Sequence, residues 1–223
     1  MLTTIERGID GPPLDYQEGW ALQRALHEEV SSGTRPGTLL LCQHDPVYTA
    51  GRRAHRSELP DPELTDTPVV AVDRGGRVTW HGPGQLVGYP IVRLHEPIDV
   101  VAYVHVLEEA LIRVVAGHGV RAVRVDGRSG VWVQQPGAPD AKLAAIGVRV
   151  ARGVTMHGFA LNVDHALEPY DRIVPCGLPD AAVTTLAAAS HRPVTVAGLV
   201  GEVVTALDDL LPTVAELPRA TAA

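Results

Sequence analysis

The sequence lacks the features that mark secreted, membrane-spanning and nucleic-acid-binding proteins. Its 223 residues include only two cysteines, Cys42 and Cys176, too few for a disulfide framework or a zinc site. No apolar run approaches the roughly 20 residues of a membrane span, and the first residues lack the basic flank and apolar core of a secretory signal. The formal charge of −7 comes without a basic stripe, which argues against nucleic-acid binding. We therefore expect a cytoplasmic protein that binds neither membranes nor nucleic acid.

Lysine is almost absent. Of the 19 basic residues, only Lys142 is a lysine, and the others are arginines. Coding bias explains the missing lysines but not the one that remains. Burial or a neighbouring charge can shift the pKa of a lysine far enough for proton transfer, whereas a guanidinium stays protonated. Lys142 is therefore a candidate for a chemical role, with a solvated surface lysine as the alternative.

Hydrophobic residues make up 45% of the chain, enough apolar material for one well-buried domain. Apolar periodicity predicts helices over 14–31, 97–117, 180–189 and 194–211. The same signals predict strands over 37–43, 68–74, 120–125, 129–135, 142–153 and 154–164, and two strands joined by a glycine-proline turn over 77–94. A long loop is expected over 44–62 and a flexible tail over 212–223. We predict a single α+β domain over 1–211, with a mixed or mostly antiparallel sheet flanked by helices.

Two segments have the composition of a ligand-binding surface. Five of the twelve residues in 74–85 are glycine or proline, which exposes backbone amides and lets a ligand approach closely. A plain turn is the alternative there. In 157–163, Gly158 and Ala160 share a strand face and leave a slot for an elongated apolar ligand. Tight packing of the sheet against a helix is the alternative.

One cysteine has the setting of a nucleophile. Cys176 stands between Pro175 and Gly177 in a predicted loop, so its thiol has the exposure that a nucleophile needs. Cys42 lies in the run LLLCQ and is expected to be buried and inert. A thiol with the ordinary pKa of about 8.5 is mostly protonated at neutral pH, so a reactive cysteine requires a base or a nearby cation.

Lys142 and the ten histidines are the candidate bases. Lys142 opens a predicted strand whose alternation places it on one face with Ala144 and Ile146, and Leu143 and Ala145 on the other. Three histidines lie beside the glycine-rich segments and remain open as bases: His44, His81 and His157. Six others are expected at the surface: His27, His95, His105, His118, His165 and His191.

Several segments together resemble the lipoyl(octanoyl) transferase family. They are RGGRVTWHGPGQLVGYP at 74–90, KLAAIGV at 142–148, HGFALNV at 157–163 and PCG at 175–177, with HDPVYTAGR at 44–52 and GRSGVWV at 127–133 flanking them. The match spans nearly the whole chain in order and spacing. Trp80 stands where the family usually has tyrosine, and Phe159 where an aliphatic residue is common. Both changes could reshape an acyl pocket.

The resemblance implies the fold of the biotin and lipoate protein ligases, an α+β domain with a curved mixed sheet. It implies that Cys176 takes an octanoyl group from octanoyl-acyl carrier protein and passes it to a lysine of lipoyl domains, those of 2-oxoacid dehydrogenase and glycine cleavage proteins. Lys142 corresponds to the dyad partner of the cysteine. No ATP, cofactor or metal is implied, and nothing demands an oligomer, so we expect a monomer.

The resemblance also implies the residues that hold the acyl chain. They are Arg74, Gly75, Gly76, Arg77, Val78, Thr79, Trp80, His81, Ala145, Ile146, Gly147, Gly158, Phe159 and Ala160. Supporting roles fall to Tyr89, His44 and His157, and His81 is an alternative base. Because acyl carrier proteins are acidic, a local basic patch must offset the net charge of −7, and Arg52, Arg53 and Arg56 are the candidates, with a solvated loop as the alternative.

Three rival functions make different predictions. The first is an ATP-dependent lipoate or biotin ligase of the same fold, because DRGGR at 73–77 is similar to the nucleotide-binding loop of those enzymes. Such a ligase makes an acyl-adenylate, so it needs ATP but no thiol nucleophile. A cysteine amidase or thioesterase would release a carboxylate without an acceptor domain. A non-catalytic acyl carrier would retain its ligand reversibly.

Overall fold

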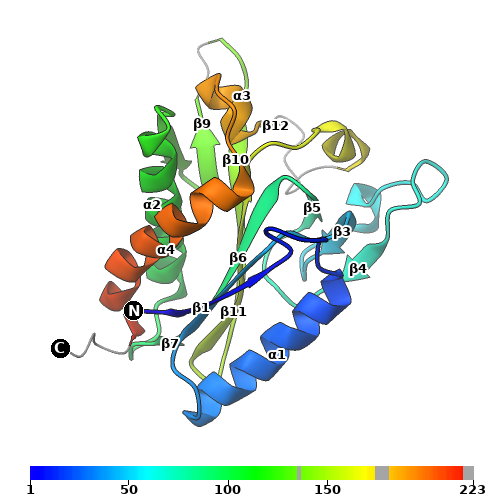
Figure 1. Ribbon diagram of the computed structural model, residues 1–223. Coiled ribbons are helices and arrows are strands. Elements are labelled where there is room, and N and C mark those ends of the chain that lie inside the picture. The colour runs from blue at the N-terminus through cyan, green and yellow to red at the C-terminus, as the bar shows by residue number, and fades with distance from the viewer. Residues whose placement is uncertain (135–136, 174–180, 218–223) are drawn as a thin grey trace.

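The computed structural model describes residues 1–134, 137–173 and 181–217. Among these residues, ten strands form one mixed sheet, in which seven follow the order β1-β2-β6-β11-β10-β9-β8 (Figure 1). Their bounds are Thr3–Arg7 for β1, Thr38–Cys42 for β2, Gln85–Ile91 for β6, Val154–Asn162 for β11, Ala141–Ala151 for β10, Arg128–Val133 for β9 and Ala122–Val125 for β8. β1 pairs with β2 in parallel and the other neighbours on this path are antiparallel. The predicted α+β class and mixed sheet are therefore confirmed.

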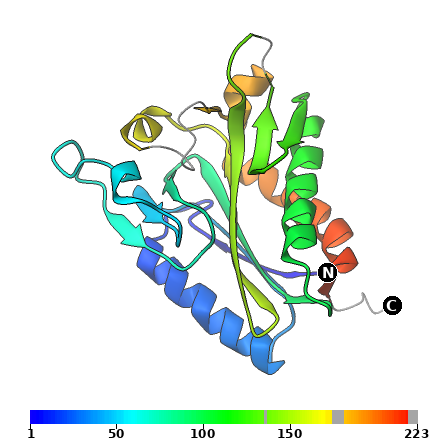
Figure 2. The same ribbon diagram turned by 180° about the vertical axis from the view of Figure 1, so that it is seen from behind.

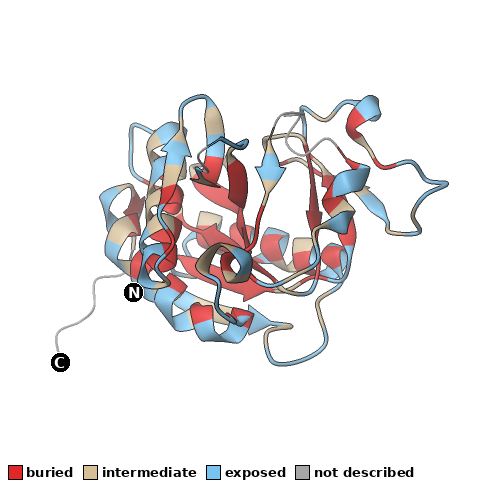
Figure 3. Ribbon diagram, turned by 90° about the horizontal axis from the view of Figure 1, so that it is seen from above, coloured by how far each residue is buried: buried red, intermediate tan, exposed pale blue. Residues whose placement is uncertain are grey.

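Helices cover both faces of the large sheet. α1 (Tyr16–Ser32) lies on one face, and α2 (Val100–Gly117) and α4 (Val196–Leu210) pack together on the other (Figures 1 and 2). The larger core fills the side of α2 and α4, and a smaller one fills the side of α1. Buried residues gather along the strands between these helices (Figure 3). Within the described residues, no helix is long and apolar enough to cross a membrane.

The ends of α1 follow from local chemistry. The Asp15 side chain accepts a hydrogen bond from the Glu18 backbone N–H at 3.0 Å, which satisfies a free donor of the first turn. Gly33 ends the helix in the left-handed conformation, with φ of +77°, which glycine adopts without steric cost. The helices predicted over 14–31, 97–117 and 194–211 are confirmed with small shifts at their ends.

A second, three-stranded sheet lies beside the first. It consists of β4 (Val69–Ala71), β3 (Val47–Ala50) and β5 (Val78–His81). The long loop predicted over 44–62 is wrong at β3, where Val47 and Tyr48 are buried and pair with β5. Only four residues of this segment are strand, and the arginines, histidines and prolines around them hide the pattern.

The two strands predicted over 77–94 exist as β5 and β6, but they belong to different sheets. β5 pairs with β3, whereas β6 pairs with β2 and β11. The turn between them is fixed by Gly84, which has φ of +84° and whose N–H donates to the Gln43 side chain at 2.8 Å. This turn joins the two sheets.

The C-terminal part differs from expectation in two places. The predicted helix over 180–189 is the short helix α3 (Leu186–Ser190), preceded by β12 (Ala182–Val183), which pairs with the start of β10. The expected tail begins inside ordered structure, because β13 (Ala215–Glu216) pairs with β7 (Arg93–Leu94). Ala215 is buried in the larger core, and this apolar contact was not evident from composition.

Candidate active site

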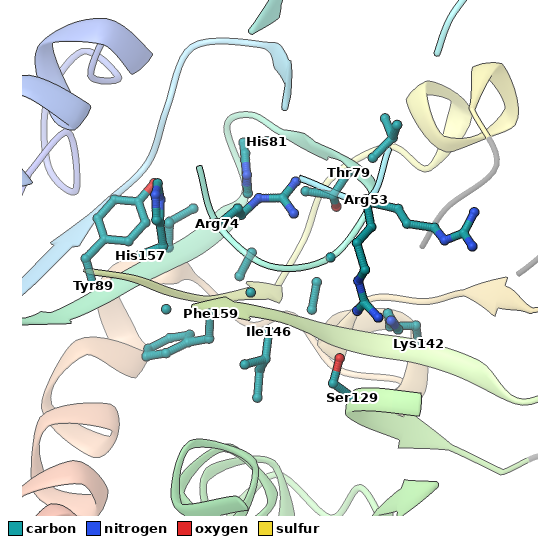
Figure 4. Close-up of a pocket in the computed structure, with 18 of the residues that line it drawn as sticks. Arg53, Arg74, Thr79, His81, Tyr89, Ser129, Lys142, Ile146, His157 and Phe159 are labelled. Carbon is teal, nitrogen blue, oxygen red and sulfur yellow. The ribbon is translucent and has the colours of Figure 1, made fainter. Parts of the chain in front are cut away.

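A cavity of about 250 Å³ lies between the 74–81 segment and the strands β10 and β11 (Figure 4). Eighteen of the binding, supporting and dyad residues predicted from the sequence lie in described segments, and fifteen of them line this cavity. The three that do not are Gly75, Trp80 and His44. Those that line it are Arg74, Gly76, Arg77, Val78, Thr79, His81, Tyr89, Lys142, Ala145, Ile146, Gly147, His157, Gly158, Phe159 and Ala160. Three separate glycine-containing segments therefore converge on one space.

The main chain holds the 74–77 segment against β10. The Gly75 N–H donates to the Val148 carbonyl at 2.9 Å. A Cβ at Gly147 would lie 3.0 Å from the Gly75 carbonyl oxygen, tighter than a side chain tolerates without a shift of the loop. Gly76 has φ of +89°, which favours glycine. The loop thus covers β10 closely and offers backbone to the cavity.

Arg74 anchors this loop from inside the protein. Its side chain is buried, and Nη2 donates to both the carbonyl and the hydroxyl of Thr49 at 2.8 Å. Nη1 donates to the Gly75 carbonyl at 3.0 Å. The guanidinium therefore ties β3 to the loop and adds a fixed positive charge beside the cavity.

Small residues form the floor of the cavity. In the antiparallel register of β10 and β11, Gly147 is opposite Gly158 and Ala145 is opposite Ala160. A Cβ at Gly158 would lie 2.2 Å from the Gly88 carbonyl oxygen, so this position requires glycine. The structure places Gly158 and Ala160 on the cavity, as the sequence predicted, and their small size leaves room for an unbranched apolar chain.

The strand β10 does not alternate regularly at Lys142. Lys142 pairs with Trp132 of β9, and the register then shifts between Lys142 and Ala144. Beyond this irregularity Ala145 lines the cavity with Lys142, while Ala144 packs in the larger core. The prediction that Lys142 shares a face with Ala144 is therefore wrong, because a β-bulge changes which face the following side chains take.

Lys142 is buried rather than solvated. It is 7% exposed, and its Nζ lies 4.5 Å from the centroid of the Trp132 ring. The alternative of a surface lysine is wrong. The chain therefore places its single amine side chain inside the cavity wall, where an amine can exchange a proton with a bound group.

The two cysteines stand differently. Cys176 lies outside the described residues. Cys42 is fully buried on β2, and burial raises the pKa of its thiol far above the ordinary range. Its Sγ lies 3.4 Å from His44 Nε2, which stays a neutral imidazole as described below. The prediction that Cys42 is buried is confirmed, and its protonated thiol makes it a poor nucleophile.

His81 lines the cavity as a neutral ring. Burial lowers its pKa to about 3, with the His44 imidazole contributing in the same direction. Its Nδ1 lies 2.7 Å from Gln85 Oε1, and its Nε2 lies 3.3 Å from the Thr49 hydroxyl. A group with so low a pKa binds a proton weakly at neutral pH, which argues against His81 as the base.

His44 and Tyr89 form a buried pair behind the cavity. His44 Nε2 lies 2.8 Å from the Tyr89 hydroxyl, and His44 Nδ1 lies 3.0 Å from the Leu14 carbonyl. Burial lowers the pKa of His44 and raises that of Tyr89, so both are neutral. His44 supports Tyr89 without lining the cavity, and Tyr89 lines it directly.

His157 is held by an acidic partner. Its Nε2 lies 2.7 Å from Asp73 Oδ1, and Arg149 pairs with the same carboxylate. Burial lowers the pKa of His157, although Asp73 opposes the shift. The residue has φ of +56°, uncommon for a side chain other than glycine, and this turns the strand just before Gly158.

Two expectations about other aromatic and histidine residues change. Trp80 packs over Gly82 in the cluster around Tyr48, so it does not line the cavity. Phe159 lies over Gly88 and does line it. His27, expected at the surface, is buried, and its Nε2 lies 3.1 Å from the Ala151 carbonyl. The reason is that α1 packs on the sheet at this turn.

Sequence reasoning missed Tyr16, Thr49 and Trp132. Tyr16 lines the cavity from α1, Thr49 holds Arg74, and Trp132 contacts Lys142. Trp132 lies in the GVWV run that the sequence had already marked as a flanking segment, which was the available signal. Across residues 1–134, 137–173 and 181–217, no three His, Cys, Asp or Glu side chains form a group that could hold a metal ion.

Comparison with known proteins identifies the family. The family model described as the lipoyl protein ligase A/B catalytic domain matches residues 15–208. The chain belongs to this family. An octanoyltransferase of Leifsonia xyli subsp. xyli is 59% identical over 197 residues, which cover 87% of this chain and 86% of that protein. An octanoyltransferase of Acidothermus cellulolyticus is 59% identical over 212 residues, covering 95% and 92%. The resemblance seen in the sequence is thus confirmed.

Solved structures of lipoate protein ligases share the fold. A bi-partite lipoate protein ligase of Thermoplasma acidophilum has a TM-score of 0.70 at 13% identity, over 100% of this chain and 86% of that chain. A lipoate-protein ligase A bound with ATP has a TM-score of 0.60 at 14% identity, over 95% and 85%. The predicted ligase-like fold of this lipoyl protein ligase A/B family member is confirmed.

Proposed function

We propose that the chain is a lipoyl(octanoyl) transferase that acts through a thioester on Cys176. The observation that carries this function is the buried amine of Lys142 in the wall of a narrow cavity floored by glycine and alanine. The floor suits an unbranched acyl chain, and the amine suits proton transfer at one end of it. The relatives named octanoyltransferase agree with this chemistry.

The first half of the reaction forms the acyl-enzyme. Lys142 takes the proton of the Cys176 thiol, and the thiolate attacks the carbonyl carbon of the octanoyl thioester on the donor. A carbon–sulfur bond forms to Cys176 as the bond to the donor sulfur breaks, and the Lys142 ammonium returns the proton to the leaving thiolate. The exchange of one thioester for another needs no ATP.

The second half transfers the acyl group to nitrogen. The ε-amine of an acceptor lysine attacks the Cys176 thioester, and a carbon–nitrogen bond forms as the bond to Cys176 breaks. Neutral Lys142 removes the proton from the attacking nitrogen and passes it to the Cys176 thiolate. The amide is more stable than the thioester, so the reaction runs toward the acceptor.

The partners follow from this chemistry. The donor is octanoyl-acyl carrier protein, and the acceptors are lipoyl domains of 2-oxoacid dehydrogenase and glycine cleavage proteins. Arg52, Arg53 and Arg56 are exposed, and Arg53 also lines the cavity, so this arginine group offers an acidic carrier a docking surface. Both catalytic groups of the scheme, Cys176 and Lys142, belong to one chain, so we infer that the protein acts as a monomer. We also infer that it acts in the cytoplasm and needs no cofactor or metal.

Intact mass measures the first half directly. The protein is incubated with octanoyl-acyl carrier protein without ATP or acceptor, and wild type is compared with Cys176→Ser and Cys42→Ser. We expect a hydroxylamine-labile octanoyl adduct on wild type and Cys42→Ser but none on Cys176→Ser. Addition of a lipoyl domain removes the adduct and acylates the domain.

The rival functions give other results in the same experiment. A ligase forms no adduct and acylates the domain only with ATP and free fatty acid. A thioesterase releases octanoate without an acceptor. A carrier protein retains the acyl donor without any covalent mass increase. Each of these results contradicts the transferase.

A further inference from the structure

Trp132 is in direct contact with Lys142. The two residues are directly opposite in the antiparallel pair of β9 and β10. Trp132 is fully buried, and Lys142 Nζ lies 4.5 Å from the centroid of its ring. This separation is well inside the range of a cation–π interaction, in which the negative face of the indole attracts an ammonium group.

The surrounding strand fixes the ring. Its Nε1 donates to the Arg128 carbonyl at 3.1 Å, which prevents rotation of the indole. Gly130, between these two residues, has φ of +116°, and its N–H donates to the buried carboxylate of Glu108 at 2.8 Å. The register shift beside Lys142 completes an irregular strand pair around this contact. The ring therefore has one position, and Lys142 lies against it.

Other cationic side chains lie around the same cavity. Arg53, Arg74, Arg77 and Arg128 line the same cavity. Arg77 is paired with Glu58, and the Arg128 guanidinium carbon lies 5.9 Å from the Trp132 centroid. The indole face is a neutral group that attracts an ammonium without bringing a counter-charge to it.

We propose that Trp132 is a positioning residue, which holds the Lys142 side chain in the cavity wall and stabilises its ammonium form. This inference rests on the Cys176 and Lys142 dyad of the proposed function. The dyad supplies the proton transfer, and Trp132 increases the fraction of protein that carries the thiolate and ammonium pair. Loss of the ring therefore lowers thiolate formation without removing either reacting group.

Alkylation of Cys176 by iodoacetamide tests this directly, because only the thiolate reacts. Rates are measured by intact mass and peptide mapping at about pH 7 and about pH 9.5, on either side of the ordinary thiol pKa of about 8.5. We expect Trp132→Leu to slow alkylation roughly tenfold at the lower pH and Trp132→Phe about threefold, since the phenyl ring is the weaker cation–π partner. At the higher pH the variants approach the wild-type rate, because hydroxide then forms the thiolate.

Two further variants separate the possible causes. Trp20→Phe is the control, because this tryptophan contacts the guanidinium of Arg24 at 4.6 Å instead of Lys142, and it leaves the alkylation rate unchanged. Lys142→Met removes the amine and slows alkylation at the lower pH. Thermal unfolding of each variant reports whether it folds, and Trp132→Phe carries the test if Trp132→Leu does not.

The outcomes are distinct. Slow alkylation of Lys142→Met with wild-type alkylation of both Trp132 variants overturns the role of Trp132 and keeps the dyad. An equal loss at both pH values also overturns it, because a distorted site slows attack at every pH. Wild-type alkylation of Lys142→Met overturns the dyad, and the positioning role with it.

Discussion

The two ends of the cavity are built on different principles. At one end lie Lys142, Ser129 and Arg53, of which Ser129 and Arg53 are exposed, and this end carries several positive charges (Figure 4). At the other end lie Tyr89 and His157, which are both buried, and we call this the closed end (Figure 4). In the proposed function the charged end would meet the partner proteins and move protons, whereas the closed end has only to be neutral in charge and fixed in shape.

The closed end is neutral and fixed in shape although several of its side chains are polar. The Tyr89 hydroxyl is bonded to His44, and His81 is bonded to Gln85, so these polar atoms have partners behind the cavity wall. Burial keeps both imidazoles neutral. Hydrogen bonds make such a wall stiffer than an aliphatic one, because each ring has one orientation. Polar residues at a site are thus no proof that they react.

The largest effect is expected at the charged end. Lys142→Arg retains a cation but cannot take a proton, so we expect octanoyl transfer to fall by at least about 100-fold. Transfer is measured with octanoyl-acyl carrier protein and a lipoyl domain. His81→Asn is the comparison and retains more transfer than Lys142→Arg. The reverse order would place the base at His81.

Between the two ends, the floor tolerates no added atom. We expect Gly158→Ala to lower the free energy of unfolding by about 1–3 kcal/mol and to reduce transfer, because its Cβ would meet the Gly88 carbonyl oxygen at 2.2 Å. Gly201→Ala is the matched control. That helical glycine has open space around its Cβ position, so alanine stabilises the protein by about 0.5–1 kcal/mol. Chemical denaturation measures both.

If Gly158→Ala were as stable and active as wild type, the strands β11 and β6 would lie farther apart than the structure places them. The floor would then have room for larger side chains, and its width could not select an unbranched chain.

The closed end should make the stability of the protein depend on pH. The pKa of His81 is about 3 in the folded protein and about 6.5 when unfolded, so below pH 6.5 the unfolded chain binds a proton that the folded one does not. Stability is full above the unfolded pKa and falls as the pH drops toward 3, by about 1.4 kcal/mol per pH unit for this residue. We expect His81→Asn to lose stability less steeply over this range.

The control for this measurement is His105→Asn, an exposed histidine on α2. Denaturant unfolding at several pH values gives each slope. A His81→Asn protein with the wild-type slope would mean that His81 takes up a proton in the folded state, and the closed end would then be charged like the open one.

The smallest effect concerns docking at the charged end. Arg52→Glu with Arg56→Glu should raise KM for the acyl carrier protein roughly five- to tenfold at low salt, and less at high salt. An octanoyl thioester of a small thiol should react as with wild type, because these side chains do not line the cavity. Arg113→Glu, on α2, is the control. If KM were equal in wild type, the double variant and Arg113→Glu, the arginine group would be part of a solvated loop with no role in docking.

Local patterns predicted the helices because each has its own signals. Asp15 and Gly33 bound α1, and their effect depends only on neighbouring residues. The short strand β3 was missed because its four residues become a strand only by pairing with β5, far along the chain. His27 was misplaced because its burial depends on where α1 lies on the sheet.

The sequence by itself determined the chemistry that the protein offers. The single lysine, the glycine-rich segments and the cysteine between proline and glycine are properties of local composition, readable without a fold. Only the tertiary structure decided how Lys142 is placed. The register of β10 shifts against β9, so that Ala144 packs in the core while the Lys142 amine lies against the Trp132 ring. Strand register and burial are set by contacts between distant segments, so no local pattern contains them.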